Sequence, residues 1–105
     1  MAGEFTQEVA SVIPVLNEES TIIECLESLC NQSYPKELHS IYIFDGGSSD
    51  STYQLVSEFI ANKDPLYPEI SLHKNPGKYV AEARNLALEI IPNSVDYLLE
   101  IIGHC

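Results

Sequence analysis

The feature that constrains this chain most is an alternation of short apolar runs with longer amphipathic stretches. β-Branched and aromatic residues are frequent in the short runs, whereas apolar residues recur every three or four positions in the longer stretches. The predicted strands are 8–15, 39–45, 68–75 and 95–102, and the predicted helices are 17–35, 48–63 and 77–93. This alternation predicts an α/β fold, a parallel Rossmann-like sheet of about four strands joined by right-handed crossovers.

The polar residues before the first helix indicate where it begins. Asn17 is placed to cap this helix, and Glu18 and Glu19 then lie in its positive first turn. Pro35 is expected to end it.

Unusual residues gather where the predicted strands end. In open parallel sheets, ligands bind beyond the carboxyl ends of the strands. Those ends are predicted at 14–17, 45–48, 75–78 and 103–105. We therefore expect a ligand site to form from these segments.

Two roles are open for Asp45, the last residue of the second predicted strand. It can point into the crevice and accept hydrogen bonds from a ribose hydroxyl or a base N–H. Alternatively, it can bond the amides of Gly47 or Ser48 in an Asx-type turn. Gly46 and Gly47 permit positive φ or a close approach of the backbone to a ligand.

The start of the second helix is a weak candidate for a phosphate site. Ser48 or Ser49 can cap this helix, and Asp50 would then place a negative charge in its first turn. No Gly-Lys-Ser/Thr sequence follows the glycines, so the loop is not a P-loop.

Two of the five cationic residues lie near the start of the third predicted helix. Lys78 and Arg84 could face an anion such as a diphosphate at the crevice. The alternative is that Arg84 pairs with Glu82 or Glu89 on a solvated surface.

Composition excludes several function classes. The 16 acidic residues against 5 Lys and Arg give a net charge of −11, which disfavours binding to nucleic acid and to anionic lipid. No apolar run approaches the roughly 18 residues of a membrane span, and no signal peptide is evident. We expect a cytoplasmic protein with reduced cysteines, in which residues 1–7 form a flexible start or a cloning remnant and 8–105 form one domain.

Taken together, these segments resemble the N-terminal, nucleotide-binding half of family-2 inverting glycosyltransferases with the GT-A fold. The resemblance covers residues 8–105 and is carried, in order, by "SVIPVLNEE", "CLESLCNQSYP", "DGGSSDST", "NPGKYVAEARN" and a final strand where the metal motif belongs. It implies that a sugar passes from a nucleotide-diphosphate donor, probably UDP-linked, to an acceptor hydroxyl.

The resemblance also implies which residues bind the nucleotide. The loop after the first strand would lie along the base and ribose, Asp45 would bond the base, and Lys78 and Arg84 would flank the donor pocket. The implied nucleotide-binding set is Pro14, Val15, Leu16, Asn17, Glu18, Asp45, Gly46, Gly47, Lys78 and Arg84.

The metal motif of this family departs from the pattern in this chain. Many members hold Mg²⁺ or Mn²⁺ through an Asp-x-Asp or Asp-x-His motif at the end of the fourth strand. Here Ile102 stands where the first aspartate belongs, and His104 stands at the third position. A histidine alone is a weak Mg²⁺ site, because Mg²⁺ prefers oxygen ligands.

In this family the acceptor site and the general base follow the fourth strand. No acid here matches the base, so no catalytic residue is assigned and the chain alone is expected to be inactive. An exposed strand edge at 95–102 would favour a homo-oligomer. Relatives often attach to membranes through later segments.

The alternative function is a non-catalytic or different nucleotide-binding Rossmann-like module, such as a nucleotidyltransferase. Those proteins usually carry a glycine-rich motif directly after the first strand. The corresponding sequence here, "PVLNEES", contains no glycine.

Overall fold

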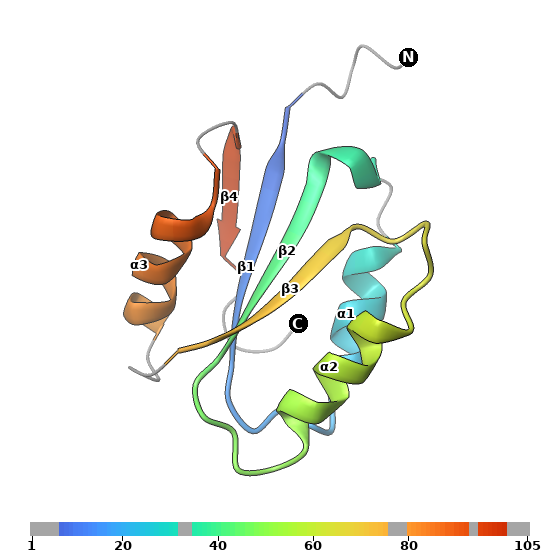
Figure 1. The fold of residues 1–105 in the computed structure, drawn as a ribbon, viewed down its shortest axis with the longest axis vertical. Helices are drawn as coiled ribbons and strands as arrows, with labels where there is room; N and C mark the ends of the chain where they lie inside the picture. The colour runs from blue at the N-terminus through green and yellow to red at the C-terminus, as the bar shows by residue number, and fades with distance from the viewer. Residues whose placement is uncertain (1–6, 32–34, 76–79, 93–94, 101–105) are drawn as a thin grey trace.

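The computed structural model describes residues 7–31, 35–75, 80–92 and 95–100. Strands and helices alternate along the chain as the sequence predicts (Figure 1). The elements are β1 (Val9–Val15), α1 (Ile22–Cys30), the short 3₁₀ helix η2 (Lys36–Leu38), β2 (His39–Asp45), α2 (Thr52–Ala61), β3 (Glu69–Lys74), α3 (Val80–Ile90) and β4 (Tyr97–Glu100).

The described strands form one parallel sheet in the order β3-β2-β1-β4, which confirms the predicted fold class. Val9 pairs with His39 and Val15 with Asp45, so β1 and β2 run in register over their full lengths. Asp45 in turn pairs with Lys74. The ends of β1, β2 and β3 therefore meet at one edge of the sheet.

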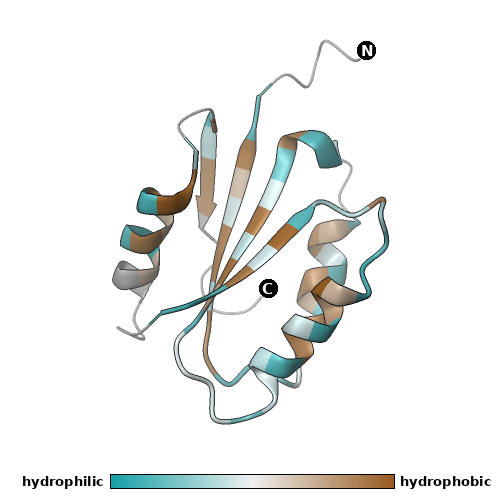
Figure 2. Cartoon of the chain, viewed as in Figure 1, coloured by the Kyte–Doolittle hydropathy of each residue, from teal (hydrophilic) through white to brown (hydrophobic). Residues whose placement is uncertain are grey.

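Alternation along the strands builds a core on each face of the sheet. Ile13 and Ile43 pack with Leu26 of α1 and Val56 of α2 on one face. On the other face, α3 packs against a second cluster formed by Val12, Phe44, Ala83 and Ala87. Neighbouring residues on a strand point to opposite faces, and Figure 2 shows the apolar residues along the strands that supply both cores.

The predicted start of the first helix is wrong. The helix α1 begins at Ile22, its N-cap is Thr21, and no side chain caps it. Asn17 lies four residues outside this cap, and its backbone φ is 53°. Its carboxamide is engaged by the loop after β2, as described below, so it does not serve α1.

The predicted caps of the second helix are also wrong. The N-cap of α2 is Ser51, which makes no side-chain cap bond. Asp50, which precedes the helix, accepts hydrogen bonds from the amide and the hydroxyl of Thr52 instead. A carboxylate thus satisfies the first free amide of α2, the task expected of a serine.

The apolar spacing of the third helix predicts an inner face made of Val80, Ala83, Ala87, Ile90 and Ile91, and the structure differs at Ile90. Ala83 and Ala87 are fully buried as expected, but Ile90 is 44% exposed. Ile91, directly after α3, lies four residues beyond Ala87 and packs against the core as expected.

The cysteines follow the expectation only in part. Cys30 is a free, buried thiol, and burial raises its pKa to about 11. Cys25, by contrast, is disulfide-bonded. Among the described residues, no helix is long and apolar enough to span a bilayer.

A buried polar contact joins β1 to β2 at the end of the sheet opposite the strands' carboxyl ends. The hydroxyl of Ser11 lies 2.8 Å from Nε2 of His39, and His39 is 5% exposed. Burial lowers the pKa of His39, because a charged imidazole would lose its hydration. Burial lowers the pKa of His73 in the same way.

These two pKa directions predict a loss of stability in mild acid. The unfolded chain binds protons at its histidines as the pH falls through about 6.5, whereas the folded chain resists them. The free energy of unfolding should therefore be level above this pH and fall below it. Urea melts of the chain and of His39→Gln between pH 7.5 and 5.5 test this, with a smaller fall expected in the variant. Equal falls would show that His39 does not contribute.

Candidate functional site

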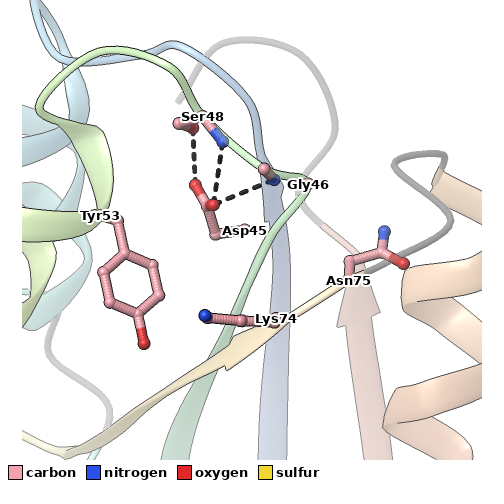
Figure 3. Close-up of a pocket in the computed structure, with 7 residues that line it drawn as sticks. Asp45, Gly46, Ser48, Tyr53, Lys74 and Asn75 are labelled. Carbon is pink, nitrogen blue, oxygen red and sulfur yellow. Dashed lines mark hydrogen bonds between the residues drawn. The ribbon is translucent and has the colours of Figure 1, made fainter.

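A cavity of about 420 Å³ opens at the carboxyl edge of the sheet, beyond β2 and β3 (Figure 3). It lies where ligands bind in open parallel sheets, and its size is typical of small-molecule sites. The residues that line it are Asp45, Gly46, Gly47, Ser48, Tyr53, Lys74 and Asn75.

Strand pairing continues into the cavity floor. The amide of Gly46 donates to the carbonyl of Val15 at 2.9 Å, and the amide of Asn75 donates to the carbonyl of Asp45 at 2.7 Å. Asp45 and Asn75 are almost fully buried. The floor is therefore held rigidly by backbone hydrogen bonds.

The Asp45 carboxylate is engaged by its own loop. One oxygen accepts from the amides of Gly47 and Ser48, both at 3.0 Å, and the other accepts from the Ser48 hydroxyl at 2.6 Å. Gly47 has φ of 93°, a conformation that glycine adopts without strain. The Asx-type turn, one of the two roles left open by the sequence, is therefore present.

A cation and an aromatic ring form the wall opposite the loop. The ammonium of Lys74 lies 5.7 Å from the ring centroid of Tyr53, within range of a cation–π contact. Figure 3 shows Lys74 reaching from β3 toward Tyr53 of α2, with Asp45 on the neighbouring strand. The cavity thus combines a flat apolar surface, a positive charge and a carboxylate.

The loop after β1 is joined to the loop after β2 through Asn17. Its carboxamide oxygen accepts from the amides of Ser49 at 2.8 Å and Asp50 at 3.3 Å, and from the Ser49 hydroxyl at 3.3 Å. The backbone amide of Asn17 donates to the Ser48 hydroxyl at 2.9 Å.

Two acidic residues of the first loop extend this junction. The amide of Glu18 donates to the Thr52 hydroxyl at 2.8 Å, and the amide of Glu19 donates to Asp50 at 3.3 Å. The Glu19 carboxylate accepts from the amide of Ser51 at 2.9 Å. In each of these bonds a backbone amide of one loop donates to a side-chain oxygen of the other loop or of the adjoining start of α2.

The start of α2 is electrostatically unsuited to a phosphate. Hydrogen bonding from the Thr52 side chain lowers the pKa of Asp50, with further lowering from the amides of Thr52 and Glu19. Asp50 is therefore ionised at neutral pH and already occupies the helix start with a negative charge.

The residues expected to bind a ligand fall into different places. Asp45, Gly46 and Gly47 line the cavity. Pro14, Val15 and Glu18 line a separate void of about 10 Å³, which holds at most one water. Leu16 and Asn17 are exposed.

The two predicted cations do not add to the described cavity wall. Arg84 is exposed on α3 and is not among the lining residues. Lys78 lies outside the described residues, as do His104 and Ile102 of the predicted metal motif. In the described part of the chain, no group of three or more His, Cys, Asp or Glu side chains could hold a metal ion.

The predicted ligand-site segments include Ser48 and Asn75, but sequence reasoning missed Tyr53 and Lys74 as cavity residues. Lys74 ends the third strand, so the rule that ligands bind at strand ends could have found it. Tyr53 carried no comparable signal. Its position depends on where α2 begins, and the sequence placed that start too early.

Known proteins resemble both this sequence and this fold. Residues 11–97 match Glycosyl transferase family 2. A dolichyl N-acetyl-alpha-D-glucosaminyl phosphate 3-beta-D-2,3-diacetamido-2,3-dideoxy-beta-D-glucuronosyltransferase of Methanococcus voltae is 40% identical over 64% of this chain and 20% of its own length. Glycosyltransferase AglE of Haloferax volcanii is 35% identical over 77% of this chain and 26% of its own length.

Solved structures of TarS share the fold of this chain. The crystal structure of S. aureus TarS matches with a TM-score of 0.71 and 25% identity, over 90% of this chain and 16% of TarS. TarS 1–349 in complex with UDP-GlcNAc matches with a TM-score of 0.69 and 27% identity, over 90% of this chain and 26% of that one. The chain therefore spans about a quarter or less of these relatives. The matched span, 11–97, takes in most of the chain, and on this ground it belongs to glycosyl transferase family 2.

Proposed function

We propose that this chain binds the nucleotide of a nucleotide-diphosphate sugar, UDP-linked, as the donor-binding part of a glycosyltransferase. The observation that carries the proposal is the cavity at the ends of β2 and β3, where Asp45, Tyr53 and Lys74 converge. Family membership and the UDP-GlcNAc complex of TarS 1–349 support the choice of ligand.

The cavity chemistry suits a pyrimidine nucleoside. An ionised carboxylate offers about four acceptor positions, and the loop uses three at Asp45, which leaves room for a base N–H. The Tyr53 ring supplies a surface on which a base can stack. Lys74 supplies a donor for a carbonyl or phosphate oxygen.

Family membership favours this proposal over the alternative of a different nucleotide-binding Rossmann-like module. We assign no general base among the described residues, so the proposal for these 105 residues is donor binding. The acceptor is left unassigned. The described residues supply no metal ligand set for Mg²⁺ or Mn²⁺.

The direct test is calorimetric titration of the chain with UDP, GDP and ADP, each with and without Mn²⁺. UDP should bind most tightly, and the affinity should be the same in both conditions because Ile102 stands in the place of the metal motif's aspartate. A folded chain that binds none of the three nucleotides would refute the proposal. A preference for GDP or ADP would refute the uridine assignment alone.

Variants of the opposite wall test the site itself. Tyr53→Leu should weaken UDP binding about tenfold, because loss of a stacking ring costs about 1–3 kcal/mol. Lys74→Met should weaken it by a similar factor, since a charged hydrogen bond is worth about 1.5–3 kcal/mol. Lys63→Met, which removes a cation away from the lining residues, is the matched control and should bind as the unmodified chain does. Equal affinities in all variants would place the nucleotide elsewhere.

We also propose that the chain self-associates through β4. This strand pairs with β1, and no other described strand pairs with it, while Tyr97 and Leu99 are each 53% exposed. A strand with one open edge and exposed apolar side chains favours pairing with a second copy.

Light scattering at micromolar concentration should therefore give a mass above that of one chain. Leu99→Lys should lower it, because the added charge opposes burial of the strand. Leu66, in the loop after α2, is 74% exposed, which is more than Leu99. Leu66→Lys should leave the mass unchanged. A clean monomer before any substitution would contradict the proposal.

A further inference from the structure

We propose that Asn17 is a positioning residue that sets the cavity wall from outside, through the loop after β2, without touching the nucleotide. This inference rests on the proposed donor-binding function. Asn17 then holds the loop that contacts the nucleotide, whereas the resemblance implies that Asn17 contacts the nucleotide itself.

A continuous chain of hydrogen bonds runs from Asn17 to the cavity. The backbone amide of Asn17 donates to the Ser48 hydroxyl at 2.9 Å, and that hydroxyl donates to the Asp45 carboxylate at 2.6 Å. Ser48 and Asp45 line the cavity, whereas Asn17 is not among the lining residues. Hydrogen bonds linked in this way polarise and strengthen one another.

The backbone conformation of Asn17 is unusual for a residue other than glycine. Its φ of 53° lies in the left-handed region, which asparagine enters more readily than most residues other than glycine. In this conformation its carboxamide oxygen accepts from the amides of Ser49 and Asp50. The position therefore requires two properties together: tolerance of positive φ and a short side chain with an acceptor.

Without Asn17, the loop after β2 would lack acceptors for the amides of Ser49 and Asp50. Residues 46–51 contain no regular structure, and the amides of Ser49 and Asp50 precede α2, so no turn of that helix serves them. A loop without these bonds would sample several conformations. The affinity of a ligand falls in proportion to the fraction of molecules that hold the binding conformation.

Three substitutions at this position separate the two properties. Asn17→Gly keeps the backbone conformation and removes the acceptor. Asn17→Ala removes both. Asn17→Asp keeps the acceptor oxygen but adds a negative charge near Asp45 and Asp50, so it is measured at raised ionic strength.

The matched control is Asn62→Gly. Asn62 follows α2, and its carboxamide donates to the Glu58 carbonyl at 2.9 Å, but it lies away from the cavity residues. The substitution Asn62→Gly therefore removes a carboxamide of the same kind from a loop that does not reach the cavity.

Two measurements are made on each variant of the chain: amide hydrogen exchange without ligand, and calorimetric titration with UDP. In Asn17→Gly the amides of Ser49 and Asp50 should exchange faster, and UDP should bind about fivefold more weakly, as expected for lost hydrogen bonds of about 1 kcal/mol. Asn17→Ala should lose about thirtyfold, because the left-handed conformation adds a cost of about 1 kcal/mol. Asn17→Asp should restore both readouts toward the unmodified chain, and Asn62→Gly should change neither.

The two proposals fail in different ways. Unchanged exchange at Ser49 and Asp50 in Asn17→Gly would overturn the role of Asn17, whatever the affinity for UDP. Faster exchange with unchanged UDP affinity would show that Asn17 stabilises the loop and does not position the site. An unmodified chain that binds no UDP would refute the donor-binding proposal, while faster exchange in the variant would still establish the link between the loops.

Discussion

The parallel, in-register pairing of β1 with β2 is the constraint on which the rest of the structure depends. Because Val15 pairs with Asp45, the two strands end at the same level and release their loops side by side. Residues that are about thirty positions apart in sequence then come within hydrogen-bonding distance. Extending the same pairing to β3 brings Lys74 beside Asp45. The cavity follows from strand register rather than from any single motif.

The contacts in this region fall into two layers. Nearest the cavity, Asp45 holds its own glycine turn and presents a carboxylate beside Lys74 and Tyr53. Behind it, Asn17 and Glu19 hold the amides that lead into α2. A loop rich in glycine and serine has little conformational preference of its own. Side chains from a neighbouring loop supply the order that its own residues do not.

Acidic residues in this junction act mainly as hydrogen-bond acceptors for backbone amides. Asp45, Asp50 and Glu19 each accept at least one amide within the two loops. Part of the chain's net charge of −11 is therefore used to build the junction. The same charges keep the start of α2 unattractive to phosphate, so Lys74 is the cation placed to meet an anionic or carbonyl oxygen within the described cavity.

The sequence by itself determined the fold class, the order of the elements and the segments that end at the carboxyl edge of the sheet, because these follow from hydrophobic periodicity, which is a local property. It also predicted Asp45, Gly46 and Gly47 at the place where the cavity forms. Tertiary structure decided the partners of Asn17, the true starts of α1 and α2, and the places of Tyr53 and Lys74. Each of these depends on which loop lies beside which. An acceptor such as Asn17 can cap its own helix or serve a neighbouring loop, and only the register of β1 with β2 selects between the two.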